Sequence, residues 1–126
     1  MSYIETIDSK IKAILSLPRY THCKNVAEFS LMLLQTYAPH LYPEREKIIL
    51  AALFHDYCRE MPKRELLAYT KEHSLTCEPE EIAFPILLHA LVASDIASNM
   101  DCLDDDEIVQ AIRWHTLGSP KMGLLG

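Results

Sequence analysis

The chain has 126 residues, of which 49 % are hydrophobic, which is enough for one domain with a core of its own. Its formal net charge of −6 argues against a nucleic-acid partner, because proteins that follow a phosphate backbone present a basic face. The four cysteines form no close pair and no zinc-ribbon spacing, and the N-terminus lacks the apolar region of a signal peptide. We therefore expect one domain, residues 1–126, in the cytoplasm, with no nucleic-acid or membrane partner.

The spacing of apolar residues predicts an all-α bundle. Apolar positions recur every three or four residues, and all three glycines lie at or after Gly118. Pro18 is expected to stop the first helix, Thr21 to cap the second, and Pro43 to open the third. The helices predicted in chain order cover residues 4–17, 21–37, 43–59, 63–72, 85–99 and 104–115, with a short turn from Glu80 before the fifth.

The third predicted helix carries a carboxylate into the interior. Residues 48–54 are all apolar and run directly into His55 and Asp56. An unpaired ionised aspartate in such surroundings costs several kcal/mol, so a cation or hydrogen-bond donors must meet Asp56. One interpretation is an ordinary ion pair with Arg59 or Arg64. The other is a functional site.

The last predicted helix begins with a run of four acids at residues 104–107. Carboxylates suit the positive end of a helix dipole, and Gly118 gives a stop signal after His115. The same run could be interpreted as a calcium loop, but it lacks the required spacing and the late glutamate. We therefore interpret it as helix capping.

Four of the six histidines fall at inward positions of separate helices. His55 ends the apolar run, and the others share apolar stripes: His22 with Val26, Phe29 and Leu33; His89 with Ile82, Ile86, Ala93 and Ile96; His115 with Ile108, Ala111 and Ile112. His40 and His73 instead look like surface residues. The inward imidazoles and Asp56 need either separate hydrogen-bonded niches or one shared metal site. Histidine and carboxylate without thiolate suit Fe, Mn, Zn, Co or Ni.

The adjacency of His55 and Asp56 favours two ions over one. Neighbouring residues on a helix project about 100° apart, so they do not easily face a single ion. Asp56 could bridge two ions, with His22 and His55 on one side and His89 and His115 on the other. Such a centre would hold a bridging hydroxide near neutral pH and clamp the oxygens of an in-line displacement at phosphorus.

In this order and spacing the motifs resemble those of the HD-domain superfamily of metal-dependent phosphohydrolases. The resemblance is nearest to the YqeK-type family, which includes symmetrical diadenosine tetraphosphate hydrolases. It rests on RYTH at residues 19–22, AALFHDYCRE at 51–60, LHA at 88–90 and AIRWHTLG at 111–118, with Lys121 and Met122 following.

The resemblance implies an all-helical HD fold with two metal ions, iron first and Mn, Co, Ni or Zn as alternatives. It implies hydrolysis of diadenosine tetraphosphate to two ADP, with His55 and Asp56 as the catalytic pair. The implied metal ligands are His22, His55, Asp56, His89 and His115, and the implied phosphate contacts are Arg19, Arg59, Thr116 and Lys121. The same ligands would serve another HD-type nucleotidase, a guanosine tetraphosphate hydrolase, or a nucleotide-binding protein without turnover.

The chain departs from the family pattern near its end. Leu117 stands where relatives often carry a second threonine. The family continues into further helices, one with an alanine-aspartate pair whose Asp completes the His22/His55 ion, whereas this sequence stops at Gly126. We therefore expect a fragment that binds that ion weakly, turns over slowly or not at all, and exposes apolar surface that favours a homodimer.

Overall fold

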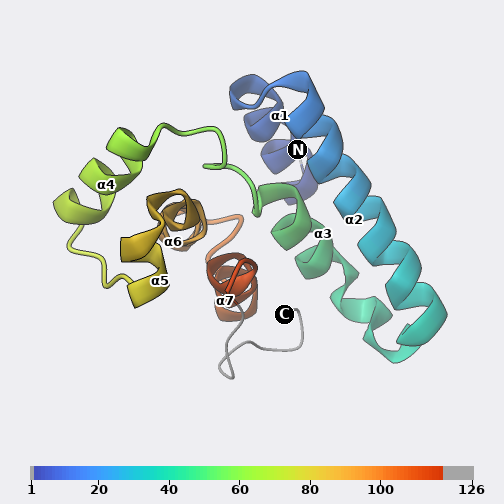
Figure 1. Cartoon of the computed structure of the whole chain (residues 1–126). Helices are drawn as coiled ribbons and strands as arrows, with labels where there is room; N and C mark the ends of the chain where they lie inside the picture. The colour runs from blue at the N-terminus through green and yellow to red at the C-terminus, as the bar shows by residue number, and fades with distance from the viewer. Residues whose placement is uncertain (1, 118–126) are drawn as a thin grey trace.

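The structure is a computed structural model that describes residues 2–117, and these residues form helices without a strand (Figure 1). The elements are α1 (Tyr3–Ile14), α2 (Leu17–Tyr37), η1 (Pro39–Glu44), α3 (Arg45–Phe54), α4 (Lys63–Glu72), α5 (Pro79–Ala83), η2 (Pro85–Leu87), α6 (Leu88–Ser98) and α7 (Asp106–Trp114). The all-α prediction is therefore confirmed. None of the described helices has the length and apolar character needed to span a membrane.

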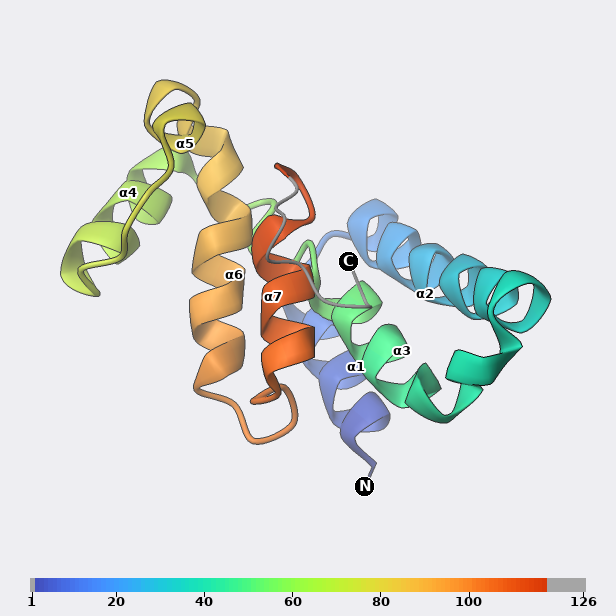
Figure 2. The same cartoon turned by 90° about the horizontal axis from the view of Figure 1, so that it is seen from below.

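Helix α3 lies at the centre of the bundle. It packs against α1, α2 and α7, while α6 packs on the far side of α7 and α4 covers α6 (Figures 1 and 2). The apolar run predicted to be buried supplies the middle of the core, where Phe54 is 0 % exposed and Leu50 and Leu53 are each 2 % exposed. Hairpin-like connections bring the start of α2 beside the end of α3, and the start of α6 beside the end of α7. Side chains at these four ends can therefore meet.

The second helix begins earlier than predicted. Ser16, not Thr21, is the N-cap, and its hydroxyl oxygen accepts a hydrogen bond from the Arg19 N–H. Pro18 lies in the first turn, where a missing N–H costs nothing, so this proline starts α2 rather than stopping α1. The earlier start places Arg19 in the first turn of α2 and His22 in the second turn.

The third helix is shorter than predicted at both ends. Residues 39–44 form the 3-10 helix η1, and α3 ends at Phe54, after which turn hydrogen bonds such as Arg59 N–H to the Asp56 carbonyl replace the helical ones. His55 and Asp56 therefore lie where the chain leaves the helix. Their side chains converge although the two residues are adjacent: Nε2 of His55 lies 3.4 Å from Oδ2 of Asp56.

The predicted inward stripe of α2 is wrong for three of its four members, because the side chain of His22 is itself 48 % exposed. Phe29 is 57 % exposed and Leu33 is 39 % exposed, and the buried face instead carries Cys23, Ala27 and Leu34. The reason is that α2 lies at the edge of the described bundle, with α3 against one face only. His22 still reaches the site because it lies near the boundary between the two faces. Ile82 likewise leaves its predicted stripe, being 69 % exposed on the separate helix α5.

The cysteines are all free thiols, and two of them are shielded. Burial raises the pKa of Cys23 to about 11 and that of Cys58 to about 12, so neither carries thiolate near neutral pH. We expect Ellman's reagent to label only the partly exposed Cys77 and Cys102 in the native protein. Fast labelling of all four before unfolding, identified by mass spectrometry, would contradict this packing.

Candidate metal centre

Asp56 is the centre of a cluster of four imidazoles. Its side chain is 8 % exposed, and its two oxygens face different histidines. Oδ2 lies 3.4 Å from Nε2 of both His22 and His55. Oδ1 lies 3.6 Å from Nε2 of both His89 and His115. The structure thus brings together all five predicted ligands and divides them into the two predicted groups around the carboxylate.

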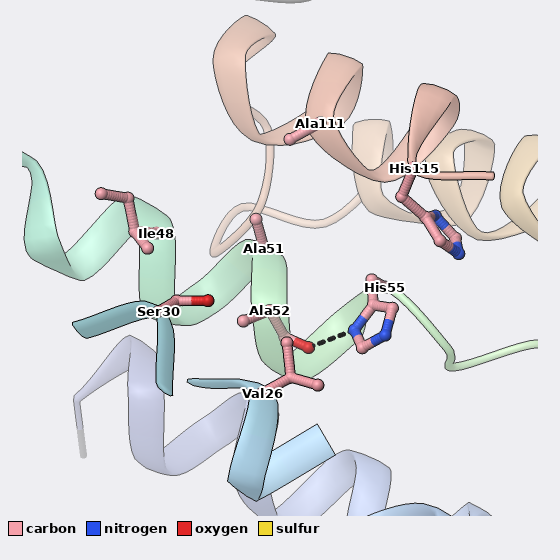
Figure 3. Close-up of a pocket in the computed structure, with 8 residues that line it drawn as sticks. All are labelled: Val26, Ser30, Ile48, Ala51, Ala52, His55, Ala111 and His115. Atoms are coloured by element: carbon pink, nitrogen blue, oxygen red, sulfur yellow. Dashed lines mark hydrogen bonds between the residues drawn. The ribbon is translucent and has the colours of Figure 1, made fainter. Parts of the chain in front are cut away.

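Four helix ends position these side chains. His22 lies in the second turn of α2, His55 follows the last residue of α3, His89 is the second residue of α6, and His115 follows the last residue of α7. In Figure 3 the rings of His55 and His115 approach from α3 and α7, and their centroids are 5.1 Å apart. The antiparallel pairs α2/α3 and α6/α7 therefore each contribute a pair of histidines.

Three of the rings are held in one tautomer by the backbone. Nδ1 of His55 bonds the Ala52 carbonyl, as the dashed line in Figure 3 shows, while His89 and His115 bond the carbonyls of Ile86 at 2.8 Å and Ile112 at 2.7 Å. A carbonyl oxygen only accepts, so Nδ1 carries the proton and the neutral ring keeps a lone pair on Nε2. Burial also lowers the pKa of His55, which favours this neutral form. Such backbone bonds typically orient metal-binding histidines.

The lone pairs then converge in a way that suits a cation. Nε2 of His89 and Nε2 of His115 are 3.2 Å apart, and both face the Asp56 carboxylate. With the Nδ1 protons in place, acceptors face acceptors. Two ligands about 2.1 Å from a tetrahedral ion are themselves roughly 3.4 Å apart, which is close to the spacing in the cluster. The donor atoms of His22, His55 and Asp56, and those of Asp56, His89 and His115, each lie within 4.8 Å of one another, so the residues fit two ions.

Asp56 is paired with a different arginine from the two considered in the sequence. The Arg19 guanidinium donates to Oδ2 of Asp56 at 3.2 Å, and no described ion pair joins Asp56 to Arg59 or Arg64. Burial acts to raise the pKa of Asp56, and protonated rings of His115, His89 and His55 would lower it. With these rings neutral, the cation that favours the ionised carboxylate is the Arg19 guanidinium. The carboxylate is therefore ionised at neutral pH and available to cations.

The remaining predicted phosphate contacts are less well placed. Arg59 is half-buried and Thr116 is exposed next to His115. Lys121 lies outside the described residues. The predicted surface histidines His40 and His73 are both exposed. Of the three candidates that the structure describes, Arg19 is the one with a hydrogen bond to Asp56.

The acidic run caps its helix as predicted. The Asp105 carboxylate accepts hydrogen bonds from the N–H groups of Glu107 at 3.0 Å and Ile108 at 3.3 Å.

The Glu60 carboxylate accepts hydrogen bonds from both the N–H and the hydroxyl of Ser16, and this contact holds the start of α2 against the turn that follows Asp56. This contact between Glu60 and Ser16 was not predicted from the sequence. The Ser-Leu-Pro start of α2 was the pattern that could have located Ser16.

A mostly apolar groove of about 180 Å³ opens beside the cluster, between α2, α3 and α7 (Figure 3). Its walls come from apolar and small side chains, and His55 and His115 stand at its inner end. The lining residues are Val26, Ser30, Ile48, Ala51, Ala52, His55, Ala111 and His115. The groove therefore connects the candidate centre with the protein surface.

An HD domain is a helical bundle in which histidines and an aspartate from several helices meet near the helix ends, as they do in this structure. The sequence pattern of that domain matches residues 19–124, and the chain belongs to the HD-domain family.

Its relatives include two proteins named symmetrical bis(5'-nucleosyl)-tetraphosphatase. The protein from Halalkalibacterium halodurans is 32 % identical over 117 residues, and that from Bacillus subtilis is 32 % identical over 120 residues. In each case the match covers 91 % of this chain and 59 % of the relative, so the chain spans little more than half of their length. The crystal structure of a predicted HD superfamily hydrolase involved in NAD metabolism, from Clostridium acetobutylicum, superposes with a TM-score of 0.82 at 28 % identity, covering 99 % of this chain and 64 % of the other.

Proposed function

We propose that this chain is the metal-binding HD domain of a phosphohydrolase that cleaves diadenosine tetraphosphate symmetrically into two ADP. The observation that carries the proposal is that each oxygen of the buried Asp56 faces its own pair of imidazole nitrogens. The names of the relatives support this choice of substrate. Imidazole and carboxylate donors suit iron, with Mn, Co, Ni or Zn as alternatives.

The residues at the cluster would have different roles in the reaction. Two ions held by the four histidines and Asp56 would supply an activated water and neutralise charge on the phosphate chain. The His22/His55 half is the more open, with the His22 side chain 48 % exposed against 5 % for His89. Arg19, already beside that half, is placed to bind a phosphate oxygen through its planar guanidinium group. We therefore assign substrate entry to the His22 side.

The test is hydrolysis by a protein of the same length as the relatives, of which this chain spans 59 %. After loading with Fe²⁺, Mn²⁺ or Co²⁺, we expect diadenosine tetraphosphate to yield ADP alone, resolved by ion-exchange chromatography. A parallel panel of a nucleoside monophosphate and guanosine tetraphosphate separates the alternative HD-type activities. ATP plus AMP as products, or no turnover with any metal, would contradict the proposal.

Replacing Arg19 is expected to weaken the binding of substrate. A hydrogen bond to a charged group contributes about 1.5–3 kcal/mol, so Arg19→Gln is expected to raise KM roughly 10- to 100-fold. Arg19→Lys should fall between, because ammonium keeps the charge but not the bidentate geometry. The control is Arg64→Gln, which changes an exposed arginine outside the cluster. Equal KM values for Arg19→Gln and the control would remove Arg19 from the phosphate site.

Helix α2 exposes several large apolar side chains. Besides Phe29, the exposed apolar side chains of this helix include Leu17 at 74 % and Met32 at 52 %. Several large apolar side chains exposed on one helix favour an interface there. We propose that a second copy of the chain covers these side chains, or a segment equivalent to the part of the relatives that this chain does not span.

A further inference from the structure

A second buried cluster lies outside the proposed metal centre. The carboxylate of Glu81 in α5 is fully buried, and the Arg113 guanidinium at the end of α7 donates to both of its oxygens at 2.9 Å. Glu81 also accepts the N–H of Glu78 at 2.8 Å, and Arg113 stacks 4.0 Å over the Trp114 ring. Among the ion pairs of residues 2–117 that involve no histidine, this is the one in which both residues are buried.

This pair is connected directly to the two histidines on Oδ1 of Asp56. The carbonyl that orients His115 belongs to Ile112, and it is part of the peptide bond to Arg113. On the other side, α5 leads within a few residues into η2, whose Ile86 carbonyl orients His89. A shift of Arg113 relative to Glu81 would therefore move the two carbonyls that fix these rings.

Stability alone does not account for such a pair. Removing two charges from water costs several kcal/mol each, and replacing a buried ion pair by apolar side chains of similar volume is often neutral or stabilising. The bidentate geometry does, however, restrict both distance and angle between the segments that it joins. Its particular contribution is therefore the relative placement of α5 and the end of α7.

We propose that Glu81 and Arg113 are positioning residues that hold His89 and His115 at the mutual distance and tautomer needed for one ion. The inference rests on the proposed metal centre for its functional meaning, but the placement of the two rings is a separate property. It predicts that loss of the pair weakens the His89/His115 half selectively and leaves the His22/His55 half intact. A pair that merely holds the fold together would affect both halves or neither.

The main experiment uses the double variant Glu81→Met/Arg113→Met, which removes both charges and keeps side-chain volume. Co²⁺ binding is measured by its visible spectrum in two backgrounds, His22→Ala to report the His89/His115 half and His89→Ala to report the other. Changes in groups that orient metal ligands typically weaken affinity by roughly 10- to 100-fold, and we expect a loss of that size in the first background alone. Unchanged affinity in the first background, with a folded protein, would overturn the proposal.

A second variant and a metal-free measurement cover the other outcomes. If the double variant does not fold, Arg113→Lys is used instead. Lysine keeps the charge but cannot form the two parallel hydrogen bonds to Glu81, so we expect a smaller loss of Co²⁺ affinity that is again confined to the His89/His115 half. Long-range imidazole ¹H–¹⁵N spectra of the metal-free protein at mildly alkaline pH report the tautomers directly. His89 and His115 should be Nδ1–H in the parent protein and mixed in either variant, whereas identical spectra would refute positioning. A parent protein with fixed tautomers that binds no ion would refute the proposed function instead.

Discussion

Replacing Asp56 by asparagine is expected to abolish the binding of both metal ions at once. The amide keeps the shape of the side chain but removes the negative charge that both pairs of imidazoles face at 3.4 and 3.6 Å. Metal ions contribute several kcal/mol to phosphoryl chemistry, so the proposed hydrolysis should slow about 1000-fold or more. Metal content per chain, measured by plasma mass spectrometry after desalting, should fall from two to none.

The matched control is Asp95→Asn. Asp95 accepts a hydrogen bond from Tyr69 at 2.8 Å, which an amide oxygen can also accept, and it takes no part in the cluster. This variant should keep both ions. Loss of only one ion in Asp56→Asn would show that the carboxylate serves one half rather than bridging the two.

Replacing Arg113 by alanine is expected to destabilise the fold strongly. The change leaves the fully buried Glu81 side chain with one backbone donor, and removing one partner of a buried pair costs about 3–5 kcal/mol. That is a large fraction of the total stability of a domain, about 5–15 kcal/mol. Urea unfolding followed by circular dichroism should show the loss as a lower midpoint with an unchanged slope.

Lys24→Ala provides the comparison for Arg113→Ala. Lys24 pairs with Asp8 at 3.0 Å, but both side chains are partly exposed, at 42 % and 27 %. Exposed pairs contribute about 0.2–1 kcal/mol, so this variant should unfold close to the parent midpoint. Similar losses for the two variants would mean that the Glu81–Arg113 pair is no more important than a surface pair.

The sequence was sufficient for the helices and for the cluster, for identifiable reasons. Proline placement and apolar spacing determine where helices can run, and α4 has the predicted bounds of residues 63–72. A histidine at an apolar position conflicts with its surroundings unless it has a partner, so several such histidines together indicated a shared site. His22 was found for a partly wrong reason, since the stripe that pointed to it is largely exposed.

The ion pairs between distant segments were not predicted from the sequence. Arg19 and Asp56 are separated by 37 residues and Glu81 and Arg113 by 32, and nothing local distinguishes their charges from those of solvated residues. The same holds for the turn after Phe54, because the apolar run continues the helical pattern up to the point where the chain leaves it. These arrangements arise from how α2, α5 and α7 pack, which a spacing pattern does not specify.

The central claim is that Asp56 bridges two ions, and anomalous scattering from crystals of the metal-loaded protein tests it most directly. Data collected at the absorption edge of the bound metal should show two peaks, one among His22, His55 and Oδ2 of Asp56 and one among His89, His115 and Oδ1. A single peak shared by all four histidines, or peaks away from Asp56, would contradict the account.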